Sequence, residues 1–503
     1  MDALTSALLV LYIAVIVVFC VYGLHRYWLL AMFQRAGGLT GADPRHRFPA
    51  LPPVTVQLPM FNEPRVAERI ITAACALDYP RHLLQIQVLD DSTDGTVEIA
   101  RACCRRLVRA GFDIQYVHRT DRAGYKAGAL AHGLRSATGA FIAVFDADFV
   151  PPPDVLKRSI HHFTDDSVGM VQMRWEHLNR EQSLLTRVQA LCLDAHFAIE
   201  QAARARTGRW FNFNGTAGIW RRACIDDAGG WSHDTLTEDT DLSYRAQLAG
   251  WRFRYLPHVV CPAELPPTIS ALMGQQHRWN KGLIQTAMKL LPTILRSRAR
   301  RGTKIEAFFH LTSPLPYAGL LLLTLLLAPA FLLAPAGDAL GAELVPILGG
   351  LCIALGTLAA CTFCIASQRA LGRPLGPAVA LLPAMMAIGI GLSVINTRAI
   401  LEALLGHRSP FLRTPKFNGA HRSDADPQAR AARVRLPAGM PEALLGALMV
   451  LCLGLSVARP AGYLALPFIF LFACGYLMIG LPQLRGALGR PPRPATRRAA
   501  EAR

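Results

Sequence analysis

The stretch that decides the fold is Phe145-Asp146-Ala147-Asp148-Phe149, which directly follows the apolar run Ala140-Phe141-Ile142-Ala143-Val144. A short run rich in β-branched and aromatic residues is typical of a buried strand. Ligands of α/β proteins bind at the carboxyl ends of such strands. Because Mg²⁺ and Mn²⁺ prefer oxygen ligands and complete their shells with water and substrate phosphates, Asp146 and Asp148 predict a metal–diphosphate site. The alternative is a solvated Asp pair in a turn.

Strand-like and helix-like patterns alternate along the chain before this site. The strand-like stretches are residues 54–58, 85–89, 113–117 and 140–145, and helical patterns occupy residues 66–77, 96–110 and 126–137. Strands that alternate with helices form a parallel sheet with helices on both faces, so we predict an α/β fold. The sequence has neither a Gly-x-Gly-x-x-Gly motif nor a Walker lysine motif, which disfavours dinucleotide and P-loop chemistry.

Polar side chains also follow the first two predicted strands. Asn62 and Glu63 come after the first strand, and Asp90 and Asp91 follow the second. The carboxyl ends of parallel strands meet at one edge of a sheet, so we expect these four residues to lie beside Asp146. This edge predicts a crevice of nucleotide size.

A lysine between two glycines begins the third helical stretch. The segment Gly124-Tyr125-Lys126-Ala127-Gly128 places Lys126 in the first turn. A helix N-terminus attracts anions, and the ammonium group adds a point charge that suits phosphate. A solvated lysine is the alternative, and the carboxylate-bearing strand ends nearby make it the weaker interpretation.

The segment Thr237-Glu238-Asp239 supplies a candidate general base. Acidic residues near the start of a helix are often simple caps, which accounts well for Glu238. Asp239 is the residue that we predict to act as the base.

An amphipathic stretch, residues 269–290, carries a candidate binding face. Gln275, Arg278 and Trp279 lie at spacings i, i+3 and i+4, which puts them on one side of a helix. An amide, a planar cation and a large aromatic ring suit a diphosphate and a sugar. The alternative is a helix that packs against a membrane surface.

The chain has 503 residues, 52% of them hydrophobic, and the excess lies outside residues 50–265. A bilayer span needs about 20 apolar residues. Four stretches are that long and two are shorter: residues 4–30, 308–333, 344–366 and 377–395, then 441–457 and 462–481. The first lacks a basic n-region and a cleavage pattern, so we expect an anchor. The pattern predicts a multi-pass membrane protein with one inserted soluble domain.

The formal net charge of +18 is concentrated in arginines beside the apolar stretches, at residues 296–301, 422–435 and 485–503. Loops with this bias stay in the cytoplasm, which favours a membrane protein with a cytoplasmic domain over a nucleic-acid-binding protein. Suppose that the soluble domain is cytoplasmic and that the second and third spans go out and return. If residues 377–395 also crossed the bilayer, residues 402–440 and the basic tail would lie outside, against this charge rule. We therefore predict that residues 377–395 lie along or dip into the cytoplasmic interface, which leaves five spans.

In order and spacing, these motifs resemble the processive family 2 glycosyltransferases, which include cellulose, chitin and hyaluronan synthases. The resemblance is strongest to the cellulose synthase-like A and C proteins, which make β-mannan or glucomannan and a β-1,4-glucan. It is carried by residues 87–94, 124–130, 145–149, 213–218, 229–231, 238–239 and 275–279. In addition, Phe411-Leu412-Arg413-Thr414-Pro415-Lys416 resembles the gating-loop motif Phe-x-Val-Thr-x-Lys, with Arg413 in place of valine.

The resemblance implies a GT-A type, Rossmann-like catalytic domain and a role for each motif residue. Asp239 would deprotonate the acceptor, and Asp146 and Asp148 would bind a divalent cation, Mg²⁺ or Mn²⁺. The residues implied at the nucleotide-sugar are Asn62, Glu63, Asp90, Asp91, Lys126 and Asp146. Those implied at the diphosphate and the acceptor are Gln275, Arg278, Trp279, Phe213, Asn214, Thr414 and Lys416.

The resemblance also implies the division of the chain. The parts are an N-terminal transmembrane helix (1–32), the GT-A domain (50–268), an interface helix (269–304), and transmembrane helices with the interfacial stretch (305–401). A cytoplasmic gating loop and linker (402–440), two transmembrane helices (441–482) and a basic tail (483–503) follow.

The expected activity is transfer of a hexose from UDP-glucose or GDP-mannose to a growing β-1,4-linked polysaccharide that leaves through the bilayer. One base and no second carboxylate nucleophile suggest a single displacement with inversion. Transfer of one sugar to a lipid acceptor and a non-catalytic membrane scaffold are the alternatives. The donor sugar and base stay open.

Overall fold

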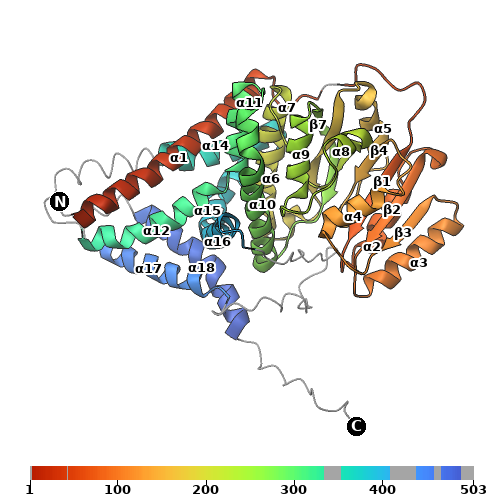
Figure 1. Cartoon of the computed structure of the whole chain (residues 1–503). Helices are drawn as coiled ribbons and strands as arrows, with labels where there is room; N and C mark the ends of the chain where they lie inside the picture. The colour runs from red at the N-terminus through yellow and green to blue at the C-terminus, as the bar shows by residue number, and fades with distance from the viewer. Residues whose placement is uncertain (1–2, 42, 334–352, 408–437, 458–465, 489–503) are drawn as a thin grey trace, which may run out of the picture.

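The structure is a computed structural model that describes residues 3–41, 43–333, 353–407, 438–457 and 466–488. The gating-loop motif at residues 411–416 lies outside the described residues, and so do Thr414 and Lys416. The molecule is elongated, with a mixed α/β part at one end and a bundle of long helices at the other (Figure 1).

A sheet of seven strands forms the centre of the α/β part. The strands are β1 (Val54–Met60), β2 (Leu84–Asp90), β3 (Ile114–His118), β4 (Phe141–Val144), β5 (Val168–His177), β6 (Gly218–Arg221) and β7 (Arg252–Ala263). Their order is β3-β2-β1-β4-β6-β5-β7. The four predicted strands are all present, and β1, β2, β3 and β4 pair in parallel as expected.

Beyond the four predicted strands the sheet is mixed. Strand β6 runs antiparallel to both β4 and β5, and β7 pairs in parallel with β5. The backbone N–H of Ala217 donates to the carbonyl of Val144, so the chain enters β6 at the carboxyl end of β4. A strand that starts there can only run against β4.

Two apolar clusters hold helices on the two faces of the sheet. One contains residues of α2 (Ala67–Cys75), α3 (Thr96–Arg109) and α5 (Val155–Ile160). The other contains residues of α4 (Tyr125–Leu134), α6 (Leu184–Ala195), α7 (Ala202–Arg206), α8 (Arg222–Asp227) and α9 (Glu238–Leu248). A single π-helical turn, His196–Gln201, joins α6 to α7. The predicted helical stretches of the sequence correspond to α2, α3 and α4.

The helical bundle contains α1 (Ala3–Arg35), α12 (Leu315–Leu333), α14 (Leu358–Ala370), α17 (Met440–Val457) and α18 (Leu466–Leu488). Ser6–Arg35, Met440–Val457 and Leu466–Gly486 are each long and apolar enough to cross a membrane. Two bent pairs pass only when joined: Arg301–Leu311 with Leu315–Leu326, bent by 51°, and Leu375–Gly391 with Ser393–Leu404, bent by 42°. The described residues therefore offer three to five spans.

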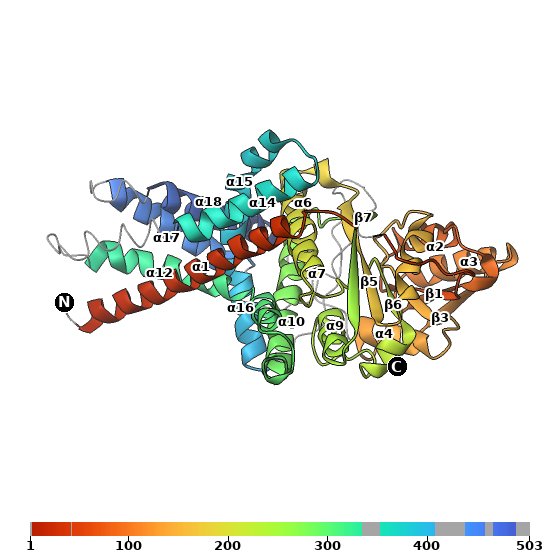
Figure 2. The same cartoon turned by 90° about the horizontal axis from the view of Figure 1, so that it is seen from above.

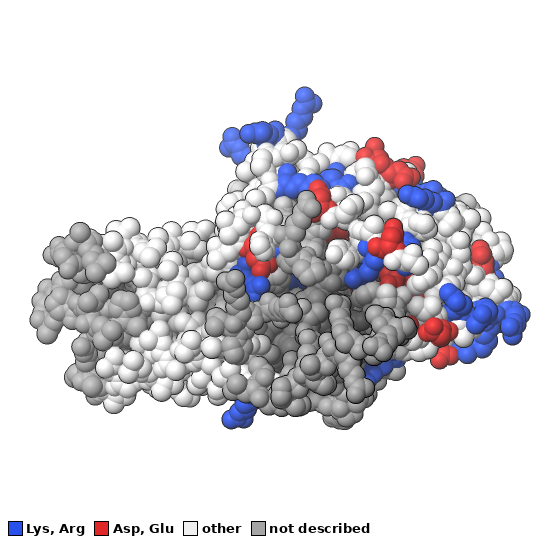
Figure 3. Space-filling view, turned by 60° about the horizontal axis from the view of Figure 1, so that its bottom comes forward, with Lys and Arg blue, Asp and Glu red and all other residues white. Residues whose placement is uncertain are grey.

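The surface agrees with this division. On the face that Figure 3 shows, Lys, Arg, Asp and Glu gather over the α/β part, whereas the described surface of the helical bundle is almost free of them. A surface without charge suits contact with lipid.

Two helices lie between the parts. Helix α10 (Ile269–Arg296) stands between the sheet and the bundle, and α16 (Ser393–Leu404) packs along it (Figures 1 and 2). In Figure 2, α16 runs across the direction of α1 and α12. Helix α15 (Leu375–Gly391) precedes α16, and α11 (Arg301–Leu311) follows α10.

Candidate active site

A cavity of about 210 Å³ opens where β1, β2 and β4 end. Its wall collects motif residues that are far apart in the sequence: Glu63, Asp91, Lys126, Asp146, Asp148, Asn214, Asp239, Gln275, Arg278 and Trp279. Three other predicted residues, Asn62, Asp90 and Phe213, are at most 1% exposed and lie behind this wall.

Asn62 and Asp90 shape the loops after β1 and β2. The Oδ1 of Asn62 accepts a hydrogen bond from the backbone N–H of Thr93 at 2.8 Å. The carboxylate of Asp90 accepts from the hydroxyl of Tyr116 at 2.7 Å and from the N–H of Ser92 at 2.9 Å. Both side chains are thus used inside the protein, where they hold the loops after β1 and β2 in shape.

Asp91 reaches the wall with its carboxylate already held by an arginine. Both oxygens accept from the guanidinium of Arg119, at 2.8 and 2.6 Å. Arg119 also donates to the carbonyls of Ala123 and Tyr125 and so ties Asp91 to the loop before α4.

Lys126 and Asp146 form an ion pair on the cavity wall. The Nζ of Lys126 lies 2.5 Å from Oδ1 of Asp146 and 2.9 Å from the carbonyl oxygen of Gly215. Burial disfavours the charge, but the carboxylates of Asp146, Glu238 and Asp239 outweigh it and raise the pKa of Lys126. A fixed cation at a helix N-terminus can bind a diphosphate.

Asp148 supplies the second carboxylate of the predicted metal site. Its side chain is 6% exposed and lies on the cavity wall together with Asp146. Carboxylate oxygens from one strand end, open to a cavity, fit a hard divalent cation that keeps positions for substrate oxygens.

Glu238 and Asp239 occupy the first turn of α9. Burial raises the pKa of Asp239 to about 7, and the neighbouring charge of Glu238 adds to the effect. Burial also raises the pKa of Glu238. The Oδ1 of Asp239 accepts from the N–H of Thr240 at 2.7 Å, which orients the carboxylate. A carboxylate poised near neutral pH suits a general base.

Helix α10 brings Gln275, Arg278 and Trp279 to the same wall, as their spacing predicted. A methyl group at Gly282 of this helix would lie 2.5 Å from the side chain of Thr237. The absence of a side chain at Gly282 therefore lets α10 approach the segment that carries Asp239.

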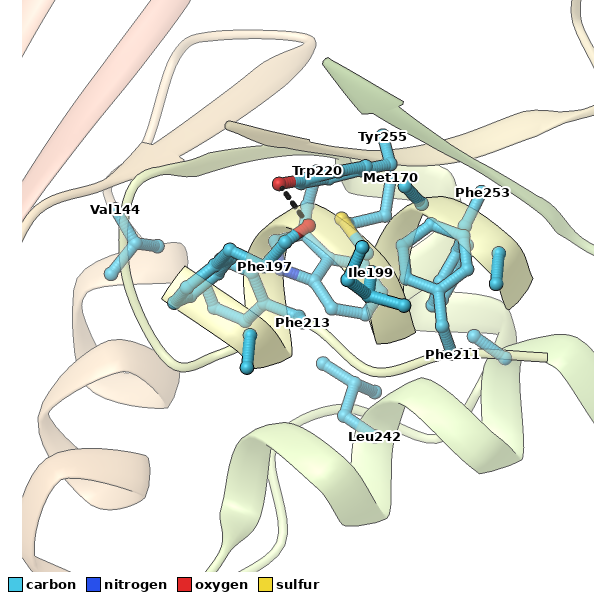
Figure 4. Close-up of a cluster of buried hydrophobic side chains, with 14 of the residues drawn as sticks. Val144, Met170, Phe197, Ile199, Phe211, Phe213, Trp220, Leu242, Phe253 and Tyr255 are labelled. Carbon is cyan, nitrogen blue, oxygen red and sulfur yellow. Dashed lines mark hydrogen bonds between the residues drawn. The ribbon is translucent and has the colours of Figure 1, made fainter. Parts of the chain in front are cut away.

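Asn214 lies on the wall, whereas its neighbour Phe213 belongs to the core. Figure 4 shows Phe213 among Trp220, Leu242 and other apolar side chains, and its ring meets that of Trp220 edge to face at 5.6 Å. Phe213 anchors the segment, and Asn214 faces the cavity.

Comparison with known proteins agrees with this arrangement. A sequence model described as "Glycosyltransferase like family 2" matches residues 52–282. Glucomannan 4-beta-mannosyltransferase 7 of Arabidopsis thaliana is 33% identical over 414 residues, which cover 80% of this chain and 71% of that protein.

The chain belongs to glycosyltransferase family 2. Glucomannan 4-beta-mannosyltransferase 2 of Arabidopsis thaliana is 45% identical over 267 residues, 51% of this chain. That match spans about half of the relative's length, 50%. A mannosyltransferase from Pyrobaculum calidifontis, solved in complex with GDP-Man and Mn²⁺, shares the fold with a TM-score of 0.54 and 22% identity, over 80% of this chain and 100% of that one. The α/β part of this glycosyltransferase is therefore GT-A-like.

The sequence alone did not predict two other residues that line the cavity, Phe61 and Arg122. The guanidinium of Arg122 lies 3.3 Å from the ring centre of Phe61, and both line the cavity beside Asp91. Arg122 has a positive φ of 47°. Neither periodicity nor spacing reveals such a stacked pair, since it depends on two loops that meet only in the fold.

A second cluster of acidic side chains lies where β5 approaches α6. Ligand-type atoms of Glu176, His177 and Asp194 lie within 4.8 Å of one another. However, Arg180 and Arg373 each bind both carboxylates, with Arg180 at 2.6 Å from Glu176 and 2.8 Å from Asp194. Two guanidinium groups already neutralise the acids, so this group fits an ion-pair network better than a metal site.

Proposed function

We propose that this glycosyltransferase transfers mannose from GDP-mannose to the end of a growing β-1,4-linked polysaccharide. The observation that carries the proposal is the single cavity that joins a cation for the diphosphate, Lys126, to a candidate base, Asp239, and to the sugar-binding face of α10. The relatives named as glucomannan 4-beta-mannosyltransferases favour mannose over glucose as the transferred sugar.

Asp239 acts as the base in this proposal. A sugar hydroxyl is a weak nucleophile, and a carboxylate within hydrogen-bonding distance removes its proton during attack. The raised pKa of Asp239 matches a proton transfer near neutral pH. The attack displaces the nucleoside diphosphate in one step, so an α-linked donor yields a β-linkage.

The leaving diphosphate is stabilised by fixed positive charge. Lys126 is held between Asp146 and the Gly215 carbonyl, and Arg278 approaches from α10. A divalent cation held by Asp146 and Asp148 would supply further charge to the diphosphate oxygens when bound. Charges held in place before the reaction lower its barrier because they need no reorganisation.

The polymer is proposed to leave through the helical bundle. Trp279 lines the cavity on the side that α10 forms, and α10 packs on α16. The stretch 377–395 is proposed to follow the cytoplasmic interface, as its flanks suggest. Arg373 before it binds Glu176 at 2.6 Å, and Glu402 after it lies 3.1 Å from His277. Both flanks therefore contact the cytoplasmic side of the proposed topology.

Membranes that contain the full chain should be incubated with radiolabelled GDP-mannose or UDP-glucose, followed by linkage analysis. The proposal expects a long, insoluble β-1,4-linked product from GDP-mannose. Membranes with Asp239→Asn at equal expression serve as the control. A lipid-linked monosaccharide as the product would favour the alternative acceptor, and no incorporation from either donor would overturn the proposal.

A further inference from the structure

The π-helical turn His196–Gln201 lies directly behind Asn214 on the cavity wall. Its side chains form hydrogen bonds to the Asn214 amide from two sides. The Nε2 of Gln201 lies 2.5 Å from Oδ1 of Asn214. The Nε2 of His196 lies 3.0 Å from Nδ2 of Asn214. Helical turns of this kind are rare and recur at functional sites.

The backbone carbonyl of Asn212 determines how the side-chain amides of Gln201 and Asn214 are oriented. The Nε2 of Gln201 also donates to the carbonyl oxygen of Asn212 at 3.1 Å. A carbonyl only accepts, so this end of Gln201 must be its NH₂ group. The atom of Asn214 that faces Gln201 is then its oxygen, and the NH₂ group of Asn214 points at His196.

The hydrogen bond with Asn214 also fixes the tautomer of His196. Its Nε2 must accept from Asn214, so the ring proton sits on Nδ1. Nδ1 lies 2.8 Å from Oε2 of Glu200, which accepts that proton in a hydrogen bond. Burial opposes the charge of Glu200, but the hydrogen bond from His196 and the charge of Arg204 hold the pKa of this carboxyl below its ordinary value. An ionised Glu200 is the acceptor that this tautomer needs.

Glu200 is itself held in place by buried partners. Arg204 is 2% exposed and lies between Glu200, at 3.7 Å, and Glu306, at 3.4 Å. Glu306 in turn binds His25 of α1 at 3.0 Å. Phe197, next to His196, is packed in the apolar core, where its carbonyl accepts from the hydroxyl of Tyr255 at 2.8 Å (Figure 4). The turn therefore cannot shift without breaking contacts on several sides.

We propose that His196 is a positioning residue for the acceptor: it presents Asn214 in one fixed orientation to a hydroxyl group of the terminal sugar. An amide has two N–H donors and two acceptor lone pairs. Gln201 uses one acceptor lone pair of Asn214, and His196 uses one of its N–H donors. One donor and one acceptor of Asn214 remain for a ligand in the cavity. A sugar hydroxyl both donates and accepts, so it matches this remaining pair. The inference rests on the proposed function, because it assigns Asn214 to the acceptor side of that reaction.

The test uses the full-length protein with GDP-mannose and measures two quantities: the mannose incorporated into polymer and the total GDP released. Four forms are compared, namely wild type, His196→Phe, Asn214→Ala and the double variant. His196→Phe keeps a ring in the space but leaves the Asn214 N–H without an acceptor. We expect polymer formation to fall about ten-fold or more, with donor KM within about two-fold of wild type. The share of GDP released by hydrolysis should rise, because the acceptor hydroxyl is misplaced while the donor still binds.

The double variant decides whether His196 acts through Asn214. Coupled residues lose activity non-additively, so the double variant should be no worse than Asn214→Ala alone. His196→Gln, whose carbonyl can accept from Asn214, should recover part of the transfer. His161→Phe is the matched control, since His161 accepts from the N–H of Phe48 at 3.1 Å away from the cavity. It should leave the ratio of hydrolysis to transfer unchanged.

Three results would overturn the inference: additive losses in the double variant, an unchanged ratio of hydrolysis to transfer in His196→Phe, or no recovery by His196→Gln. If His196→Phe fails to fold, the ratio of hydrolysis to transfer is compared in His196→Gln and Asn214→Ala. The inference expects the ratio to be higher in Asn214→Ala than in His196→Gln, and equal ratios would overturn it. Failure of the proposed function is a different result, because wild type itself would then form no polymer.

Discussion

A methyl group at Gly215 would lie 2.9 Å from Oδ2 of Asp239. The glycine has a positive φ of 81°, and its carbonyl oxygen accepts from Lys126 at 2.9 Å. The position therefore serves two functional groups at once. It leaves room beside the candidate base, and it holds the cation that faces the diphosphate.

Gly215→Ala should remove most turnover, because the new methyl group displaces the Asp239 carboxylate from its place. A misplaced base costs about 10²-fold or more. Gly208→Ala is the matched control: Gly208 has a similar φ of 67°, but nothing lies within 4 Å of the added methyl group. Both variants should lose about 1–2 kcal/mol of stability through backbone strain. Equal turnover in the two variants would contradict the role of Gly215.

Asp239→Asn should abolish transfer and leave nucleotide binding almost unchanged. The amide keeps the size of the carboxylate but cannot accept the proton, a loss of about 10²–10⁴-fold. The measurements are polymer formation and the Kd for GDP. Asp226→Asn, at a position where the carboxylate is 64% exposed, is the control. Near-normal turnover by Asp239→Asn would dismiss Asp239 as the base.

The pH dependence of kcat/KM should follow the same carboxyl group. Because the fold raises the pKa of Asp239 to about 7, the group is protonated and inactive below that pH. Activity should therefore rise as the pH increases through about 7. An active variant with the base intact, such as Gln276→Ala on α10, should keep this limb. A rate that is flat between pH 5 and pH 8, at about 25 °C, would contradict the assignment.

Asp148→Ala should remove the metal dependence of nucleotide binding. The measurement is the affinity for GDP with and without Mn²⁺. Glu176→Gln tests the other acidic group, which its two arginines make a poor metal site. We expect Mn²⁺ to strengthen GDP binding in Glu176→Gln and to have no effect in Asp148→Ala. The reverse pattern would move the metal to the Glu176 group.

Glu402→Gln should destabilise the contact between α16 and α10. The Nζ of Lys281 is buried, 3.0 Å from Glu402 and 2.7 Å from the carbonyl of His407. The substitution removes the negative charge beside the buried Lys281 ammonium, and breaking a buried ion pair costs about 3–5 kcal/mol. Thermal unfolding in detergent measures the loss. Glu181→Gln, whose ion pair with Arg187 is 72% exposed on the glutamate side, should change the melting temperature little. Equal melting temperatures for the two variants would argue against the buried pair.

The topology predicts that residues 415–435 are accessible from the same side as the catalytic domain. Epitope tags in this segment can be tested with protease in sealed vesicles of both orientations. Tags near residues 110 and 425 should be cleaved in the same vesicles, since residues 108–111 at the end of α3 are exposed. Cleavage in opposite orientations would mean that residues 377–395 cross the bilayer.

Much of the fold was readable from local patterns. The apolar runs of β1 to β4, the helices between them and the polar residues at the strand ends follow from side-chain periodicity, which depends only on neighbours in the sequence. The same holds for the face of α10, since i, i+3 and i+4 spacing brings Gln275, Arg278 and Trp279 together in any helix.

Only the tertiary structure decided which polar residues face the cavity. Asn62 and Asp90 look like ligand contacts in the sequence, but the fold uses their oxygens to bind Thr93, Ser92 and Tyr116. The tertiary structure also decided that β6 runs antiparallel to β4 and β5, since strand direction depends on where the chain re-enters the sheet.

The orientation of Asn214 is the clearest case. It depends on Gln201 and His196, and through Glu200 on Arg204 and distant α11, none of which a motif indicates. A sequence pattern records which side chains are available and how often they recur. Hydrogen-bond direction is settled only when groups from separate elements meet at fixed distances, because each donor and acceptor then constrains the next.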